Sequence, residues 1–539
     1  MNLKKIKITP TLIILLFLFS NSSFAQSIEE GIKFIDNHKY NAAAEVFNKL
    51  LETNKTAVNY YYAGKISAIL NKTEDAENLF KAGFAVDKDN FYNQVGLGFV
   101  ALLKNDTANA RSIFGKIIEE DEFDTPGLLL EIADSYLMAN SSDNSYPISL
   151  LTKYKSMKNY KKDANVLVKL GLLNLNGYSA SIAIEHFKNA TYIDKNLKTP
   201  YIGIARIYQK IKSYQDAESN LEEAKKIDST FAPLHLEYSE FYATTKQYEK
   251  AVVSYKKYIE YSELTNDKQA KYATLLFLAS NYEGAVAEIL KIKNTDKFDK
   301  QLSHILAYCY YFLNNFNDGI PAFNEYFGKI ESVDISASDY EFLGKLNVLA
   351  NNDSAVVDNY TKCIQLDSSK ASLYGDIAGL YFKQKDWANT AKYFQLKLQN
   401  VGKLSLKEYF DLGRCYMITK EYSLADTVYG MVIEAKSDLA LGYLMRARAK
   451  SSIDTTSELG LAKPFYEKFI ELAVTSATPE KYTPDLIEAY SYLGYFYYIK
   501  KEDPAYLTTW NEAFKLNWGK VLELDPANVQ AIEALKTVK

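Results

Sequence analysis

A single spacing of 34 residues constrains this chain more than any other feature of its sequence. Between residues 183 and 319, small residues recur at that interval, and they are Ala183, Ala217, Ala251, Ala285 and Gly319. A compact globular fold has no need of such a period. A solenoid, in which copies of one unit stack on each other, requires it. The sequence therefore predicts a repeat protein.

Residues 198–231 show what the repeating unit is. Its apolar side chains are three or four positions apart on either side of a break near residue 212, which is the spacing of two amphipathic helices. The first helix face carries Tyr201, Ile204, Ala205 and Tyr208, and the second carries Tyr214, Ala217, Leu221 and Ala224. The small residue in the first stripe lets the second helix come close. We therefore expect an antiparallel helix pair.

The same register runs through the rest of the chain. The close-approach position of the first helix is always small: Gly31, Gly64, Gly98, Ala133, Gly171, Ala205, Ser239, Ala273, Ala307, Gly344, Ala378, Gly413, Ala447 and Gly494. The facing position of the second helix is always large: Phe47, Phe80, Phe114, Tyr154, Phe187, Leu221, Tyr255, Ile289, Phe323, Tyr360, Phe394, Tyr429, Tyr466 and Trp518. Extra polar residues near 140–147, 451–458 and 501–506 lengthen three of the repeats, and we expect loops there.

The pattern Tyr-x₂-Ile-Ala-x₂-Tyr followed by Ala-x₃-Leu resembles the tetratricopeptide repeat (TPR), which has the same period and a small residue at the same place. The resemblance implies an all-α fold, a right-handed superhelical solenoid of about fourteen helix-turn-helix repeats. The solenoid would occupy residues 26–526. Residues 527–539 would form a C-terminal capping helix with Asn528 as its N-cap.

Residues 1–25 carry the pattern of a signal peptide. Lys4, Lys5 and Lys7 precede an apolar run over Leu12–Phe19 and a small-x-small cleavage site. A membrane anchor is the weaker alternative, because the run is shorter than the roughly 20 residues of a membrane span. No cysteine follows the run, so a lipoprotein leader is not supported. The sequence predicts an exported chain, periplasmic or associated with the outer membrane or secreted, and its composition resembles exported proteins of Bacteroidetes-type bacteria.

Charge and cysteine content argue against a nucleic-acid-binding protein and against a fold held together by disulfides. The chain has 63 Lys and Arg against 67 Asp and Glu, a net charge of −4, and so lacks the basic character of a nucleic-acid-binding protein. Its three cysteines, Cys309, Cys363 and Cys415, are too few and too scattered for a disulfide framework. We expect them to be buried, unreactive thiols.

Signals of catalysis are missing, and we expect no enzyme, cofactor or metal site. The four histidines fall in different repeats, without a cysteine or second histidine at the spacing of metal ligands. The segment Gly96-Leu97-Gly98 lacks the third glycine of a phosphate-binding loop and lies in a helical pattern.

The resemblance also implies where a partner binds, since first helices line the concave groove of TPR proteins. Aromatic and arginine side chains commonly anchor interfaces. On that face we expect partner contacts from Tyr308, Tyr311, Lys345, Phe382, Phe410, Arg414 and Arg448. The basic members recur at one register, which favours acidic groups on the ligand. The alternative is that the aromatic residues only pack neighbouring repeats together.

These observations predict a non-catalytic scaffold for protein–protein interaction in the bacterial cell envelope, with a protein or peptide held in the groove. Association with an envelope complex is an extension of that prediction. The competing hypothesis is a periplasmic carrier or chaperone for unfolded peptide or glycan. An enzyme is a third class, and it would need a metal or nucleophile cluster formed between loops.

Overall fold

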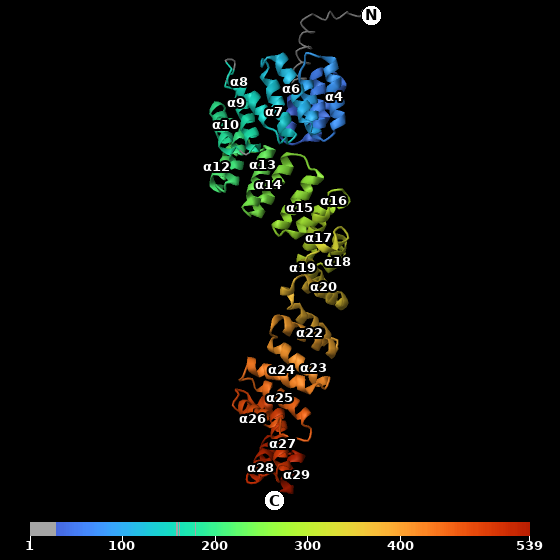
Figure 1. Cartoon of the computed structure of the whole chain (residues 1–539), viewed down its shortest axis with the longest axis vertical. Coiled ribbons are helices and arrows are strands. Elements are labelled where there is room, and N and C mark those ends of the chain that lie inside the picture. Colours follow the sequence, from blue (N-terminus) through green and yellow to red (C-terminus); the bar gives the residue numbers. More distant parts are fainter. Residues whose placement is uncertain (1–27, 158–159, 161, 178, 539) are drawn as a thin grey trace, which may run out of the picture. The chain divides into compact units, whose positions relative to one another are not determined.

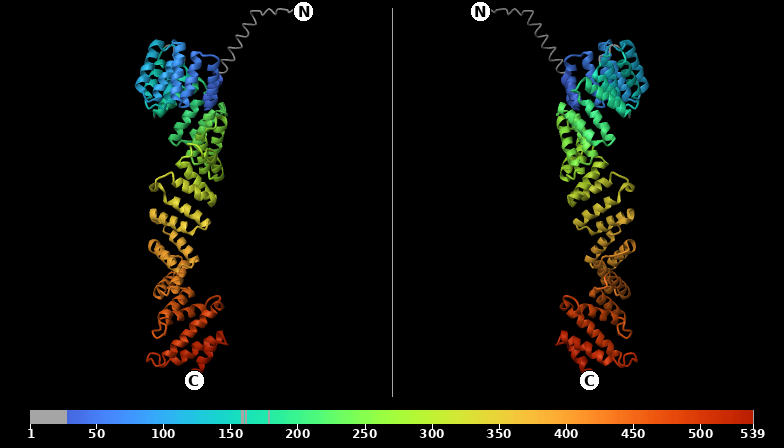
Figure 2. Two further views of the ribbon diagram at one scale, coloured as in Figure 1. Left: turned by 90° about the vertical axis from the view of Figure 1, so that its right-hand side faces the viewer. Right: turned by 90° about the vertical axis from the view of Figure 1, so that its left-hand side faces the viewer.

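The structure is a computed structural model that describes residues 28–157, 160, 162–177 and 179–538. The predicted signal peptide lies outside the described residues. Over these ranges every regular element is a helix, and consecutive helices pack side by side in pairs (Figures 1 and 2). The all-α repeat solenoid predicted from the sequence is confirmed. The chain divides into two compact units, unit 1 (residues 1–309) and unit 2 (residues 310–539).

Unit 1 opens with helical residues 28–36. Its further helices are α2 (Tyr40–Thr53), α3 (Ala57–Ile69), α4 (Thr73–Val86), α5 (Tyr92–Leu103), α6 (Thr107–Asp121), α7 (Pro126–Met138), α8 (Ser145–Lys155), α9 (Ala164–Asn176), α10 (Ala180–Ile193), α11 (Lys198–Lys210), α12 (Tyr214–Ile227), α13 (Ala232–Thr244), α14 (Tyr248–Tyr261), α15 (Asn266–Leu278) and α16 (Tyr282–Ile292). Helix α17 (Lys300–Phe312) spans the boundary.

Unit 2 continues with α18 (Phe316–Phe327), η1 (Ser332–Asp334), α19 (Ala337–Leu349), α20 (Asp353–Leu366), η2 (Ser368–Lys370), α21 (Leu373–Lys383), α22 (Trp387–Val401), α23 (Leu406–Ile418), α24 (Tyr422–Ala435), α25 (Ala440–Ile453), α26 (Lys463–Val474), η3 (Pro479–Tyr482), α27 (Thr483–Ile499), α28 (Trp510–Leu524) and α29 (Val529–Thr537). Asn528 accepts a hydrogen bond from the Ala531 N–H and so caps α29, which packs on α28.

The small and large positions of the register face each other inside each helix pair. A Cβ atom placed on Gly171 would lie 2.4 Å from the ring of Phe187, and one on Gly344 would lie 2.4 Å from the ring of Tyr360. Such distances are far below van der Waals contact, so the backbone of the first helix rests directly on the large ring. The register predicted from the sequence is the packing that the structure shows.

A left-handed residue ends the first helix of most repeats. In the repeat of α11 and α12, Lys212 has a φ of 63°, and the Ser213 N–H donates to the Tyr208 carbonyl over 2.8 Å. This is the Schellman arrangement, which satisfies the last carbonyls of a helix within a very short connection. The position seven residues after the small residue repeats this conformation at Asn71, Asn105, Asn140, Lys212, Lys246, Ser280, Asn314, Asn351, Lys385 and Lys420.

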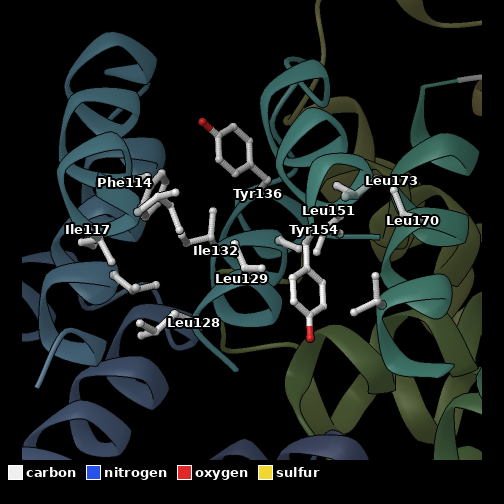
Figure 3. Close-up of a cluster of buried hydrophobic side chains, with 14 of the residues drawn as sticks. Phe114, Ile117, Leu128, Leu129, Ile132, Tyr136, Leu151, Tyr154, Leu170 and Leu173 are labelled. Atoms are coloured by element: carbon white, nitrogen blue, oxygen red, sulfur yellow. The ribbon is translucent and has the colours of Figure 1, made fainter. Parts of the chain in front are cut away.

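The largest buried cluster of unit 1 lies where the period first breaks. Phe114 from α6, Ile132 and Tyr136 from α7, and Leu151 from α8 are almost completely buried there (Figure 3). The loop predicted over residues 140–147 is shorter in the structure, because α8 already begins at Ser145 and the buried Pro147 lies in its first turn. Proline is tolerated there, since first-turn N–H groups have no helical partner.

The two other lengthened connections also differ in their bounds from the ranges that the sequence suggested. Helix α25 continues to Ile453, so the connection before α26 covers residues 454–462 rather than 451–458. The carboxylate of Asp454 accepts hydrogen bonds from the Leu459 and Leu461 N–H groups and holds this connection in shape. Between α27 and α28, residues 500–509 form turns.

The first repeat of unit 1 contacts residues that lie about 200 positions further along the chain. The Asn41 N–H donates to Glu263 over 2.9 Å, and the side-chain carbonyl of Asn37 accepts from the Ala232 N–H over 3.1 Å. His38 Nδ1 lies 3.1 Å from the hydroxyl of Tyr258. These contacts close unit 1 on itself, and no 34-residue pattern predicts them.

Candidate functional site

The side chains that bridge consecutive first helices define the surface on which the sequence places partner binding. We call it the first-helix face, formed by the residues one and four places after each small position and those two and three places before it. One place after and two places before the small position lie Arg206 and Gly203 in the repeat of α11, and Glu240 and Glu237 in the repeat of α13. The face therefore follows directly from the register.

Opposite charges pair across this face in unit 1. Asp134 on α7 pairs with Lys169 on α9, Arg206 on α11 with Glu237 on α13, and Glu240 on α13 with Lys271 on α15. In each case the residue after the small position meets the residue two places before the small position of the next first helix. These ion pairs therefore hold neighbouring repeats in register.

The Arg206–Glu237 pair is the most buried on its acidic side. Arg206 Nε lies 2.5 Å from Glu237 Oε2, and the Glu237 side chain is only 2% exposed. Burial raises the pKa of Glu237, and the guanidinium of Arg206 opposes that rise. A buried carboxylate of this kind depends on its partner, since an unpaired buried charge is costly.

A hollow of about 350 Å³ opens between α3, α5 and α7 of unit 1. The rings of Tyr61 and Tyr92 line it with centroids 5.4 Å apart, and Glu131 forms part of its wall. The carboxylate of Glu131 accepts hydrogen bonds from Tyr61 and Lys65 at 2.5 Å each. Hydrogen bonds within the chain therefore already satisfy the Glu131 carboxylate in the wall of this hollow.

In unit 2 the predicted residues fall into separate groups, of which the first joins α17 to α19. The ring of Tyr311 stacks on that of Phe342 with centroids 4.0 Å apart and an interplanar angle of 6°. Lys345 lies over the Phe342 ring and donates to Glu341 over 2.6 Å. The same Glu341 accepts from Lys370, so a carboxylate of the chain serves both lysines.

The second group joins α21 to α23. The Phe382 ring meets Trp387 edge-on at 5.5 Å, and the Arg414 guanidinium lies over Phe382 at 5.7 Å. Phe410 packs on the core beside Tyr429, with ring centroids 6.2 Å apart. Arg414 itself is exposed. This group combines half-buried aromatic surface with an accessible cation.

The third group is an ion-pair cluster between α25 and α27. Arg448 donates to both Glu488 and Asp485, at 2.6 and 2.8 Å, and the Tyr466 hydroxyl donates to Glu488. The hydrogen bonds with Glu488 raise the pKa of Arg448 further above its already high value. Arg448 is therefore held by the chain in this structure.

Tyr308, the remaining predicted residue, belongs to unit 1, where its ring lies 4.2 Å from that of His304. Tyr311 packs on Phe342 of the next repeat, as the alternative interpretation proposed, whereas Phe382 and Phe410 meet Trp387 and Tyr429 of their own repeats. Carboxylates of the chain neutralise Lys345 and Arg448, so the expectation of an acidic ligand in unit 2 depends on Arg414. Phe342 and Glu488 were not among the predicted residues, although they are a large and an acidic residue on first helices.

The three cysteines are buried free thiols. Burial raises the pKa of both Cys309 and Cys415 to about 12, which leaves these thiols protonated and unreactive. Within the described part of the chain, no group of three or more His, Cys, Asp or Glu side chains is placed to hold a metal ion. None of the helices described is both long enough and apolar enough to cross a membrane.

Comparison with known proteins agrees with the repeat. Residues 199–231 match the family model of the tetratricopeptide repeat. The C-terminal part of a TPR repeat-containing protein from Cytophaga hutchinsonii is 29% identical, over 49% of this chain and 99% of that chain, with a TM-score of 0.33. A tetratricopeptide repeat protein from Parabacteroides merdae is 14% identical, over 47% and 93% of the two chains, with a TM-score of 0.28. No curated protein matches.

Repeats of this family are generally modules for protein–protein interaction. The matched segment is the helix pair of α11 and α12, whose register of small and large residues recurs from Gly31 to Trp518. Residues 199–231 are therefore a tetratricopeptide repeat, within a chain of helix pairs that share its register.

Proposed function

We propose that this protein is a non-catalytic scaffold that holds a protein partner on the first-helix face of unit 2. The observation that carries the proposal is the group around Phe382 and Arg414. An exposed guanidinium there lies on an aromatic ring beside a second aromatic residue, Trp387, which is the composition of interface anchors.

The arrangement of charge favours unit 2 over unit 1 for this role. In unit 1 the cations of the first-helix face bind carboxylates of the chain, and the first repeat closes back on α13 to α15. In unit 2 the aromatic groups at Tyr311 and Phe382 are only half-buried. A partner can therefore gain contacts there without first breaking an ion pair of the chain.

The proposal includes export to the cell envelope. The Lys-rich start, apolar run and small-x-small junction within residues 1–25 support a signal peptide, and the compositional resemblance to exported proteins of Bacteroidetes-type bacteria points the same way. N-terminal sequencing of the protein from its native host tests this step, with Gln26 expected as the first residue. An intact Met1 or a purely cytoplasmic pool would contradict it.

A matched pair of variants tests the scaffold itself. The groove variant combines Tyr311→Ala, Lys345→Ala and Arg414→Ala, and the control combines Lys392→Ala, Leu424→Ala and Thr427→Ala on exposed positions of second helices. Chemical cross-linking in the native envelope, followed by mass spectrometry, should recover a partner with wild type and control but not with the groove variant. Equal recovery with all three would contradict binding on the first-helix face.

A further inference from the structure

Arg414 departs from the rule that the charges of the first-helix face follow in unit 1. In unit 1 the charged residue after the small position meets an opposite charge two places before the small position of a neighbouring first helix, as in Arg206 with Glu237 and Glu240 with Lys271. Lys65 follows the same rule, but its partner lies one first helix further along the chain. We call the position two places before each small residue the acceptor position. The next first helix has Gly96 at this position, so Lys65 extends to Glu131 one repeat further on.

The acceptor position opposite Arg414 holds Met445 instead of an acid. Arg414 follows the small Gly413 on α23, and Met445 precedes the small Ala447 on α25 by two places. A thioether is at best a weak acceptor and cannot balance a guanidinium. The register therefore supplies a cation at this point of unit 2 without the carboxylate that the same register provides in unit 1.

Neighbouring acids are already occupied. Asp411, one turn before Arg414, pairs with Lys407 at 2.5 Å, and Asp426 on α24 binds Arg446 at 2.8 Å. Glu408 binds Lys397 at 2.6 Å. Among the side chains that the structure describes, no carboxylate lies within ion-pair distance of Arg414, which is exposed.

We infer that a carboxylate of the partner fills this vacant acceptor position, so that the partner segment carries an acidic side chain beside an apolar one. The inference rests on the proposed function and names the chemistry of its partner. A guanidinium offers a planar fork of donors that matches a carboxylate, and its stacking on Phe382 holds the fork in place. Phe410, Met417 and Met445 all pack half-buried against the same core and offer apolar surface around the fork.

A substitution that places an acidic residue at the acceptor position tests the inference most directly. Met445→Glu places a carboxylate of the chain at the acceptor position, where it competes with the partner for Arg414. Met445→Gln has the same size without the charge and is the matched control. The probe is a fluorescein-labelled peptide of four Glu-Phe repeats, and a peptide of four Gln-Phe repeats shows what the apolar side chains contribute alone.

Fluorescence anisotropy at 50 mM salt then distinguishes the outcomes. Wild type and Met445→Gln should bind the Glu-Phe peptide with dissociation constants within about twofold of each other, whereas Met445→Glu should bind it about tenfold or more weakly. Arg414→Gln, at an exposed position that does not threaten folding, should show the same loss. Equal binding of the Glu-Phe peptide by wild type, Met445→Glu and Arg414→Gln would overturn the inference, as would equal binding of the Glu-Phe and Gln-Phe peptides by wild type.

Failure of this inference differs from failure of the scaffold proposal. If cross-linking in the envelope recovers the same partner with wild type and Met445→Glu, the scaffold stands and the carboxylate at Arg414 is refuted. If the Tyr311/Lys345/Arg414 variant also recovers that partner, the first-helix face itself is refuted.

Discussion

Gly413 on α23 and Tyr429 on α24 approach each other so closely that a Cβ atom at position 413 would lie 2.4 Å from Tyr429 Cε1. The Tyr429 ring is 2% exposed and has little room to move. We therefore expect Gly413→Ala to force the helix pair apart and to lower the free energy of unfolding by about 1–3 kcal/mol. Urea denaturation followed by circular dichroism measures the change.

Gly379 on α21 is the matched control for this prediction. It is also a helical glycine of unit 2, but a Cβ atom there would meet nothing within 4 Å. Gly379→Ala should raise the free energy of unfolding by about 0.5–1 kcal/mol, because alanine loses less entropy on entering a helix. Equal effects of the two substitutions would show that the close approach at Gly413 is not what positions α23 and α24.

The ion pairs between first helices should differ in strength according to their burial. Arg206→Ala leaves the 2% exposed Glu237 without its donor, and we expect a loss of about 1–3 kcal/mol. Lys271→Ala breaks a pair whose side chains are 49% and 45% exposed, and it should cost less than about 0.5 kcal/mol. Adding Glu237→Gln to Arg206→Ala should recover part of the loss. Additive effects in this double-mutant cycle would contradict coupling between the two residues.

Glycine at the left-handed position between paired helices should stabilise the protein. Lys385, with a φ of 61°, pays the steric cost of a Cβ atom in this region, which glycine avoids. Lys385→Gly should stabilise unit 2 by about 0.5–1 kcal/mol. Gln399→Gly, at an exposed position inside α22, should instead destabilise it by about 1 kcal/mol. Thermal unfolding of both variants checks the contrast in sign.

Closure of unit 1 should weaken in acid through His38. Burial, and secondarily the positive charges of Lys268 and Arg206, lower the pKa of His38 from 6.5 to about 4. The unfolded chain therefore takes up this proton first as the pH falls below 6.5. The contribution of His38 is complete above pH 6.5 and is lost towards pH 4, with a loss on the order of 2 kcal/mol.

Hydrogen exchange of residues 28–53 at pH 7 and pH 4.5 measures this effect. His38→Asn retains a residue that tolerates the left-handed conformation but removes the titrating group. After correction for the intrinsic exchange rate, protection should fall in acid more for wild type than for His38→Asn. An equal fall in both would assign the effect to other groups of unit 1.

Much of the fold follows from local sequence rules. The pairing of Gly171 with Phe187, and of Gly344 with Tyr360, is a contact between two residues 16 positions apart, and a period of small and large residues is enough to predict it. The return of Asn41 to Glu263 could not be predicted, because it depends on how small rotations between repeats accumulate over 222 residues. The boundary between the units is not visible in the register for the same reason.

The candidate site was predictable only in part. The first-helix face follows from helical geometry, so Tyr311, Phe382 and Arg414 could be assigned to it from the sequence. The partners of Arg448 could not, because its ion pairs join α25 to α27, whereas Glu341 lies four residues before Lys345 on the same helix. Lys345 and Arg448 resemble Arg414 in the sequence, yet Glu341 and Glu488 bind the first two.

Site-specific photo-cross-linking tests the central claim most directly. A benzoylphenylalanine residue replaces Phe382 on the first-helix face, or Leu424, which is 42% exposed on the second helix α24, and cells are irradiated before the envelope is isolated. Binding on the first-helix face predicts a protein adduct from position 382 that disappears on adding Arg414→Gln, and no adduct from position 424. An adduct from position 424 alone, or one from position 382 that survives Arg414→Gln unchanged, would contradict it.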